Sequence, residues 1–161
     1  MASVPEHILG FLKNWIITYV KHKNLLTKDI IEIKESEDSV YVLYKDKKQF
    51  FSLIPFMNSI EEIFEKMKKA KLEHNLTSFT IVCFNTKKNL NILIANWNKF
   101  IAFKELSFIF VNPFSKTEKK WIIFPYYHAK ISESESLEQG LKSMYSLVDE
   151  TTQEFIEKVL S

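Results

Sequence analysis

Three short runs of almost uninterrupted apolar residues place the strongest constraint on the fold of this chain. They read "FTIVCF", "LSFIFV" and "WIIF", at 79–84, 106–111 and 121–124. Short runs rich in β-branched and aromatic side chains are typical of strands, whereas helices that fill a core are longer. A strand that is apolar on both faces needs a covering layer on each face. The sequence therefore predicts inner strands of a sheet with helices packed on both sides.

Helix-period patterns separate and flank these runs. Ser3 and Glu6 have capping-box spacing, so a first helix is expected to begin near residue 4 and to end at the lysine-rich "KHKN". Ser59 and Glu62 repeat this spacing before a helix that reaches about residue 73, and Thr86 caps a third helix. Two further helices are predicted near the C-terminus, with apolar faces formed by Leu137, Leu141, Met144, Tyr145 and Val148 and by Phe155, Ile156, Val159 and Leu160.

Three more strand candidates lie between the first and second helices. They are "DIIEIK" at 29–34, "VYVLY" at 40–44 and "QFFSLIPF" at 49–56, separated by the polar turns "SEDS" and "KDKK". Short turns of this kind predict an antiparallel meander. The loop "PFSKTEKK" similarly predicts a hairpin between 106–111 and 120–124.

The predicted element order is αβββαβαββαα. It indicates an α/β fold with a single mixed sheet of about six strands and helices packed on both faces. A length of 161 residues and a hydrophobic fraction of 46% favour one domain over residues 1–161. We expect 149–161 to form a loosely attached terminal helix, because a short terminal helix makes few contacts.

Composition excludes several kinds of partner and chemistry. All 22 basic residues are lysine, so the two-pronged recognition of phosphate or bases by arginine is absent, and anions must be bound by lysine, backbone amides or hydroxyls. No apolar stretch reaches the roughly 18–20 residues that span a membrane. The start "MASVPEHILGFLKN" has no basic leader before an apolar run. We expect no membrane partner and a cytoplasmic location.

The sequence also lacks most motifs that identify a reaction. Cys83 is the single cysteine, which excludes an internal disulfide and a cysteine-based zinc site, and its apolar run predicts a buried side chain. Two glycines cannot supply a glycine-rich phosphate loop or a dinucleotide fingerprint. The four histidines show no metal-ligand spacing, at His7, His22, His74 and His128.

The order of the first six or seven elements, over residues 5 to about 111, resembles the restriction-endonuclease-like core of the PD-(D/E)xK nuclease superfamily. The resemblance lies in element order alone. It implies an acidic residue on the second strand and a Glu-x-Lys on the third, which hold a magnesium ion for phosphodiester hydrolysis. Carboxylates are suitable ligands for this ion, and the lysine assists the attacking water.

The residues depart from that pattern on the third strand. Asp38 stands at the start of the second strand, but "QFFSLIPF" contains neither an acid nor a lysine. The triplet Glu32-x-Lys34 lies on the first strand instead, where we interpret it as the exposed face of an edge strand. A nuclease-like fold here would therefore have lost its active site. We assign no metal ligand, and magnesium is expected only if an acidic cluster converges.

The best site candidate is the stretch that follows "WIIF". Pro125 ends that strand, so "YYHAK" is expected at the carboxyl edge of the sheet, where ligands of open α/β sheets bind. An alternative is that the tyrosines pack beneath the last helices and leave the histidine and lysine in solvent. The predicted binding residues are Tyr126, Tyr127, His128 and Lys130, with Asn112 and Lys116 from the preceding loop.

Three functions remain open. The first is a non-catalytic or degenerate nuclease-like domain that binds nucleic acid or another anionic partner through lysines, tyrosines and His128. The second is a protein-interaction or oligomerisation module, which the 14 phenylalanines and six tyrosines favour. The third is a small hydrolase with His128 as base, for which spacing assigns no nucleophile or carboxylate partner. The catalytic candidates are thus His128 for this function and Asp38 for the nuclease resemblance. We favour a function without catalysis.

Overall fold

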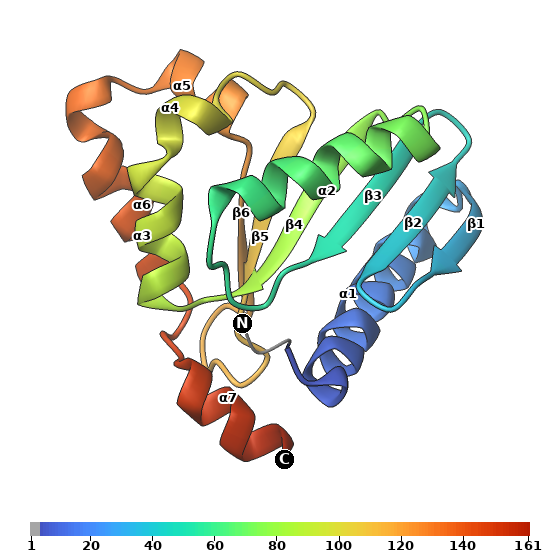
Figure 1. Cartoon of the computed structure of the whole chain (residues 1–161), viewed down its shortest axis with the longest axis horizontal. Coiled ribbons are helices and arrows are strands. Elements are labelled where there is room, and N and C mark those ends of the chain that lie inside the picture. Colours follow the sequence, from blue (N-terminus) through green and yellow to red (C-terminus); the bar gives the residue numbers. More distant parts are fainter. Residues whose placement is uncertain (1–3) are drawn as a thin grey trace.

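The computed structural model describes residues 4–161, and these form one open, mixed, six-stranded sheet with helices on both faces (Figure 1). The strands are ordered in the sheet as they are in the chain. This confirms the predicted fold class and the order of the predicted elements. The strands are β1 (Ile30–Glu35), β2 (Ser39–Tyr44), β3 (Lys48–Leu53), β4 (Ser78–Phe84), β5 (Leu106–Val111) and β6 (Lys120–Ile123).

The first three strands form the expected antiparallel meander, and β6 forms the expected hairpin with β5. Between these two units, β3, β4 and β5 run parallel to one another. We call the edge where β3, β4 and β5 begin the amino edge, and the edge where they end the carboxyl edge. Because β2 and β6 run the other way, β2 begins at the carboxyl edge and β6 ends at the amino edge.

Helices cover the two faces unequally (Figure 1). α1 (Glu6–Thr27) and α7 (Gln153–Leu160) pack on one face, and the remaining helices pack on the other. These are α2 (Ile60–Glu73), α3 (Lys87–Ala95), α4 (Trp97–Phe100), α5 (Pro125–Ile131) and α6 (Leu137–Ser146), with the 3-10 turn η1 (Ser134–Ser136) before α6.

The inner strands are buried on both faces, as their apolar runs predict. On β4, Phe79 and Cys83 join the core beneath α2, α3 and α6, whereas Val82 and Phe84 join the core beneath α1. All of β5 is buried as well. Burial raises the pKa of the Cys83 thiol, so this residue is the small buried side chain that the sequence predicted.

Buried asparagines fix the loops at the carboxyl edge. The Asn85 amide donates to the carbonyls of Tyr145 and Val148 at 3.2 and 3.0 Å, and its oxygen accepts from Trp121 Nε1 at 2.7 Å. Asn89 donates to the Pro55 carbonyl at 3.0 Å. A buried amide whose donors and acceptor are all paired stabilises one loop arrangement over others.

Two boundary predictions were wrong. α1 does not end at "KHKN" but continues to Thr27, where Lys28 adopts a left-handed conformation with φ 50°. The Asn24 side chain accepts from the amides of Asp29 and Ile30 at 2.9 and 3.1 Å, which ties the helix end to β1. At the other end, α1 begins at Glu6 after Pro5, and the predicted cap Ser3 lies outside the described residues.

The second error concerns the segment after β6. Pro125 is expected from the sequence only to end a strand, but it is also the first residue of helix α5. Proline suits that position because its fixed φ is helical and the first helical amide has no partner within the helix. The third predicted helix also divides at Asn96 into α3 and α4.

The C-terminal helix makes one deep contact. Ile156 of α7 is fully buried in the core beneath α1, whereas Phe155 and Val159 are 46% and 43% exposed. Whether 149–161 is loosely attached, as predicted, therefore depends largely on how much the Ile156 side chain contributes to the free energy of unfolding.

We expect Ile156→Ala to lower the free energy of unfolding by about 2–4 kcal/mol, because it removes buried methyl groups and leaves a cavity. Val159→Ala on the same helix is the matched control and should change it by less than about 1 kcal/mol. Urea denaturation followed by tryptophan fluorescence measures both. Equal, small effects would mean that α7 is loosely held.

Candidate functional site

The structure divides the predicted binding residues between opposite edges of the sheet. The register pairs Phe108, near the start of β5, with Ile123 at the end of β6. Tyr126 to Lys130 therefore lie at the amino edge, and the prediction that they lie at the carboxyl edge is wrong. Asn112 and Lys116 follow β5 and lie at the carboxyl edge. The two groups cannot form one site.

At the amino edge, α5 presents a small aromatic and basic cluster. Tyr127 is 48% exposed and its ring lies 5.2 Å from that of Tyr126, edge to face. Lys130 Nζ lies 4.6 Å from the centre of the Tyr126 ring. The ammonium of Lys130, and to a smaller extent that of Lys104, lowers the pKa of the Tyr126 phenol. The side chains are accessible, so the alternative of tyrosines packed beneath the last helices does not apply to Tyr127.

Within residues 4–161, the His128 ring packs against an aromatic side chain and not against a carboxylate. Its ring meets Trp97 edge to face with 5.7 Å between the centroids, and no described carboxylate forms an ion pair with it. Asp38, the other catalytic candidate, lies at the carboxyl edge beside Leu53. The two residues are therefore at opposite edges and cannot act on one substrate together.

Asn112 and Lys116 serve the carboxyl-edge loops. The Asn112 amide is buried, donates to the Asp149 carbonyl at 2.9 Å and accepts from the Phe114 amide at 3.0 Å. The Lys116 backbone amide donates to Asp149 Oδ2 at 2.8 Å, and its side chain is exposed. Asn112 thus has a structural role that the sequence did not reveal.

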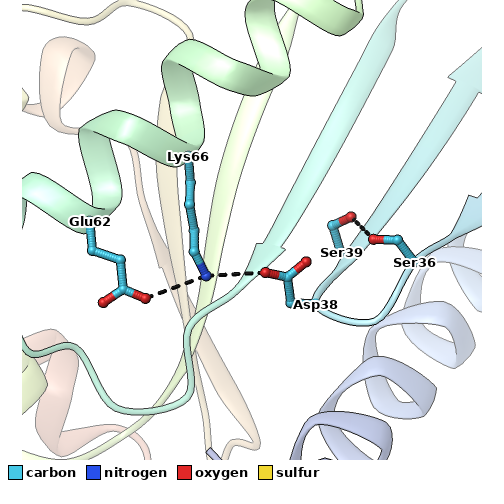
Figure 2. Close-up of polar contacts among 5 residues, drawn as sticks. All are labelled: Ser36, Asp38, Ser39, Glu62 and Lys66. Atoms are coloured by element: carbon cyan, nitrogen blue, oxygen red, sulfur yellow. Dashed lines mark hydrogen bonds and ion pairs between the residues drawn. The ribbon is translucent and has the colours of Figure 1, made fainter. Parts of the chain in front are cut away.

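Asp38 forms an ionic triad with two residues of α2 (Figure 2). Lys66 Nζ lies 3.2 Å from Asp38 Oδ2 and 3.4 Å from Glu62 Oε1. Glu62 and Lys66 are one helical turn apart, so both side chains reach the same point beside β2. The sequence interpretation used Glu62 only as a capping residue, and so it missed the triad.

The triad borders a cavity of about 370 Å³ between α2 and the strands β1 to β3. Its floor includes Tyr41, whose ring stacks on His74 with 4.2 Å between the centroids. Ser36 and Ser39 share a hydroxyl hydrogen bond at the rim (Figure 2). On the neighbouring edge strand, Glu32 and Lys34 are exposed and 3.9 Å apart, which agrees with their interpretation as a solvated face.

The magnesium site that the nuclease resemblance implies does not fit these residues. The Lys66 ammonium lies between the two carboxylates, and β3 supplies Ser52 rather than an acid opposite Ser39. Among residues 4–161, no three Asp, Glu, His or Cys side chains gather closely enough to hold a metal ion. Magnesium needs near-octahedral oxygen ligands, so metal-dependent cleavage has no support in this donor set.

Lysines and exposed apolar side chains concentrate at the amino edge. We call the segments 21–31, 45–48, 71–77, 99–105 and 124–131 the amino-edge surface. It carries ten lysines against four acids, whereas the rest of the chain carries twelve lysines against sixteen acids. The lysines are Lys21, Lys23, Lys28, Lys45, Lys47, Lys48, Lys71, Lys99, Lys104 and Lys130.

The same surface holds most of the exposed apolar side chains. Seven of the eleven large ones that are exposed in the described residues belong to it. They are Leu25, Leu26, Ile31, Leu72, Phe124, Tyr127 and Ile131. Sequence reasoning missed this surface because its segments are far apart in the chain and are brought together only by strand direction.

A cavity of about 300 Å³ opens in this surface between α1 and the sheet. A row of polar side chains crosses its floor: Gln49 donates to Thr80 at 3.1 Å, and the Thr80 and Ser107 hydroxyls are 2.8 Å apart. Tyr44 lines one wall, and burial, with the nearby charge of Asp29, raises the pKa of its phenol to about 12.

No known protein family, curated protein or solved structure shows significant similarity to this chain. Over residues 4–161, no helix combines the length and the apolar character that crossing a membrane requires.

We expect MgCl₂ to raise the midpoint of thermal unfolding no more than NaCl of equal ionic strength does. The reason is that Lys66 neutralises the carboxylates that would bind Mg²⁺. Differential scanning fluorimetry over millimolar MgCl₂ measures this. Asp38→Asn is the control and should respond to both salts as the wild type does. A rise with Mg²⁺ that Asp38→Asn abolishes would restore a metal site.

Proposed function

We propose that this protein binds single-stranded nucleic acid across its amino-edge surface and does not cleave it. The observation that carries the proposal is the gathering of ten lysines with exposed aromatic side chains at one edge of the sheet. The proposal keeps the predicted roles of Tyr126, Tyr127, His128 and Lys130, and it leaves Asn112 and Lys116 outside the binding surface.

The lysines supply attraction to phosphates. Lysine acts as a point charge on phosphate and releases counterions when it binds, so affinity does not require arginine. The charge is also segregated: the excess of lysine at this edge is offset by an excess of acid elsewhere. An anionic chain would therefore be attracted to the amino edge and repelled from other parts of the molecule.

The aromatic side chains favour a single strand over a duplex. Phe124 and Tyr127 are each 48% exposed, and exposed rings can stack on bases that are not paired. The nearby cavity has a polar floor of hydroxyls and an amide, which are groups that can hydrogen-bond a base edge. Its volume lies at the small end of the range for ligand sites.

A degenerate nuclease-like domain is consistent with the triad at Asp38. The element order resembles that superfamily, but the place of its metal site holds a lysine ion pair and lies at the opposite edge from the amino-edge surface. Binding without cleavage follows from these two features.

We expect a labelled oligothymidylate to bind with an affinity that falls as salt rises, measured by fluorescence anisotropy. Lys104→Ala combined with Lys130→Ala should reduce the slope of log affinity against log salt by roughly 1.4, since each phosphate contact contributes about 0.7 for single strands. Tyr127→Ala should weaken binding roughly tenfold, because base stacking contributes about 1–3 kcal/mol per base.

The matched control is Lys142→Ala combined with Lys158→Ala, which removes the same charge away from the amino edge and should leave the slope unchanged. An equal decrease of this slope in both double variants would mean that the binding reflects net charge alone. No binding at low salt would refute the proposal.

A protein partner is the second candidate. Leu26 and Ile131 are 92% and 86% exposed on the same surface, and aliphatic side chains of this kind more often bury against protein than stack on bases. Light scattering with the wild type and Leu26→Glu distinguishes the cases: a dimer that the substitution disrupts favours self-association.

A further inference from the structure

A cavity of about 370 Å³ lies at the carboxyl edge, where α3 and α7 both begin. The residues before the two helices run side by side, because Thr86 and Thr151 form a parallel bridge and the Thr151 amide donates to the Asn85 carbonyl at 3.0 Å. In Figure 1, α3 runs upward from this place and α7 runs downward from it. The positive ends of two helix dipoles therefore meet at one cavity.

Each helix start has backbone donors to spare. The Thr86 hydroxyl accepts from the Asn89 amide at 3.2 Å, and the Thr152 hydroxyl accepts from the Phe155 amide at 3.1 Å. The caps thus satisfy the third helical amide in each case, and the first two have no partner within a helix. Within residues 4–161, no hydrogen bond is made by the amides of Lys87, Lys88, Gln153 and Glu154.

A second and independent observation points to a missing partner. Thr151 lines the cavity and is 5% exposed, and its hydroxyl is the one buried side-chain polar atom without a hydrogen-bond partner in residues 4–161. Buried hydroxyls are normally paired, so this one marks a place where an acceptor from outside the chain would be stabilised.

Two lysines and two acids surround the cavity, so its side-chain charges balance and attraction to an anion depends on the helix starts. Lys87 and Lys88 are exposed at the first turn of α3, and Lys88 Nζ is held 3.1 Å from Asn58 Oδ1. Two acids are also near: Glu150 accepts from the Tyr145 hydroxyl at 2.6 Å, and Glu154 lies in the first turn of α7. The hydrogen bond to Tyr145 occupies one oxygen of the Glu150 carboxylate.

The place of the cavity in the fold and the hydrogen bonds of its loops also suit a ligand site. It follows β4 at the carboxyl edge of parallel strands, where open α/β sheets bind ligands. Asn85 and Asn89 fix the loop between β4 and α3 through buried hydrogen bonds to other loops. A site formed by backbone amides needs such fixed loops, because the donors must already point at the ligand.

From these observations we infer that the cavity between the starts of α3 and α7 binds a phosphate group. Helix starts, lysines and a hydroxyl are the groups that bind phosphate where arginine is absent. The inference is independent of the proposed nucleic-acid surface, since the two lie at opposite edges and share no residue.

The test measures thermal midpoints in inorganic phosphate and in chloride of equal ionic strength. We expect phosphate to raise the wild-type midpoint beyond the effect of chloride. Thr151→Val should raise the midpoint measured without phosphate, because it removes an unpaired buried hydroxyl. It should also raise the phosphate concentration needed for a given midpoint shift by about tenfold. Thr151→Ser keeps the hydroxyl and should keep the response.

The charge comparison uses two lysine pairs. Lys87→Ala combined with Lys88→Ala should abolish the response, whereas Lys68→Ala combined with Lys69→Ala removes an adjacent exposed pair on α2 and should not. In amide NMR spectra, phosphate should shift the signals of Lys87, Lys88 and Gln153 first. Absence of a phosphate effect beyond chloride, or a full response in Thr151→Val, would overturn the inference.

A final comparison distinguishes the sources of phosphate. If the protein binds adenosine monophosphate more tightly than inorganic phosphate, and Thr151→Val loses this binding, the ligand is a phosphorylated molecule. Equal affinity for the two would indicate free phosphate. Both results support the site. The oligothymidylate assay is performed on the same variants, and unchanged binding there shows that the two sites are separate.

Discussion

Burial of β4 and β5 on both faces is the constraint on which the rest of the structure depends. Their side chains fill the core beneath α1 on one side and the core beneath α2, α3 and α6 on the other. Helices that cover these strands also connect them, and β3, β4 and β5 run parallel because such crossovers return the chain to the same edge. Parallel strands in turn give the sheet two chemically different edges. All candidate sites lie at one or the other of these edges.

The edges differ in what they present. At the carboxyl edge, buried asparagines hold the loops and two helices begin, which gives fixed amide donors. At the amino edge, α1, α2 and α4 end and the turns are rich in lysine, which gives point charges among exposed apolar side chains. The first environment suits a small anion bound at one place, whereas the second suits a long anionic chain bound at many places.

The fold could be predicted from the sequence because its signals are local. Apolar runs specify the inner strands, and Ser59 and Thr86 cap their helices as expected, each accepting from the amide three residues on. The sites could not be predicted in the same way, because they depend on strand direction. The expected hairpin between β5 and β6 already implied that Tyr126 lies at the amino edge, and the prediction applied a rule for parallel strands to an antiparallel one. The ion pairs of Lys66 and the unpaired buried hydroxyl of Thr151 required the packed structure, since both depend on residues far away in the chain.

In the Asp38 triad, an ammonium lies between two carboxylates that could otherwise contact a divalent ion. A divalent ion and an ammonium both neutralise two carboxylates, but the ammonium is attached to α2 and donates hydrogen bonds rather than accepting ligand electrons. It can hold α2 against the start of β2, and it cannot polarise a phosphoryl oxygen or lower the pKa of a bound water as a metal does. With the third strand lacking an acid, a single substitution of Lys66 would uncover two carboxylates and still leave an incomplete site. A complete metal site at this place would require at least one added carboxylate on β3, near Ser52, in addition to the loss of the Lys66 charge.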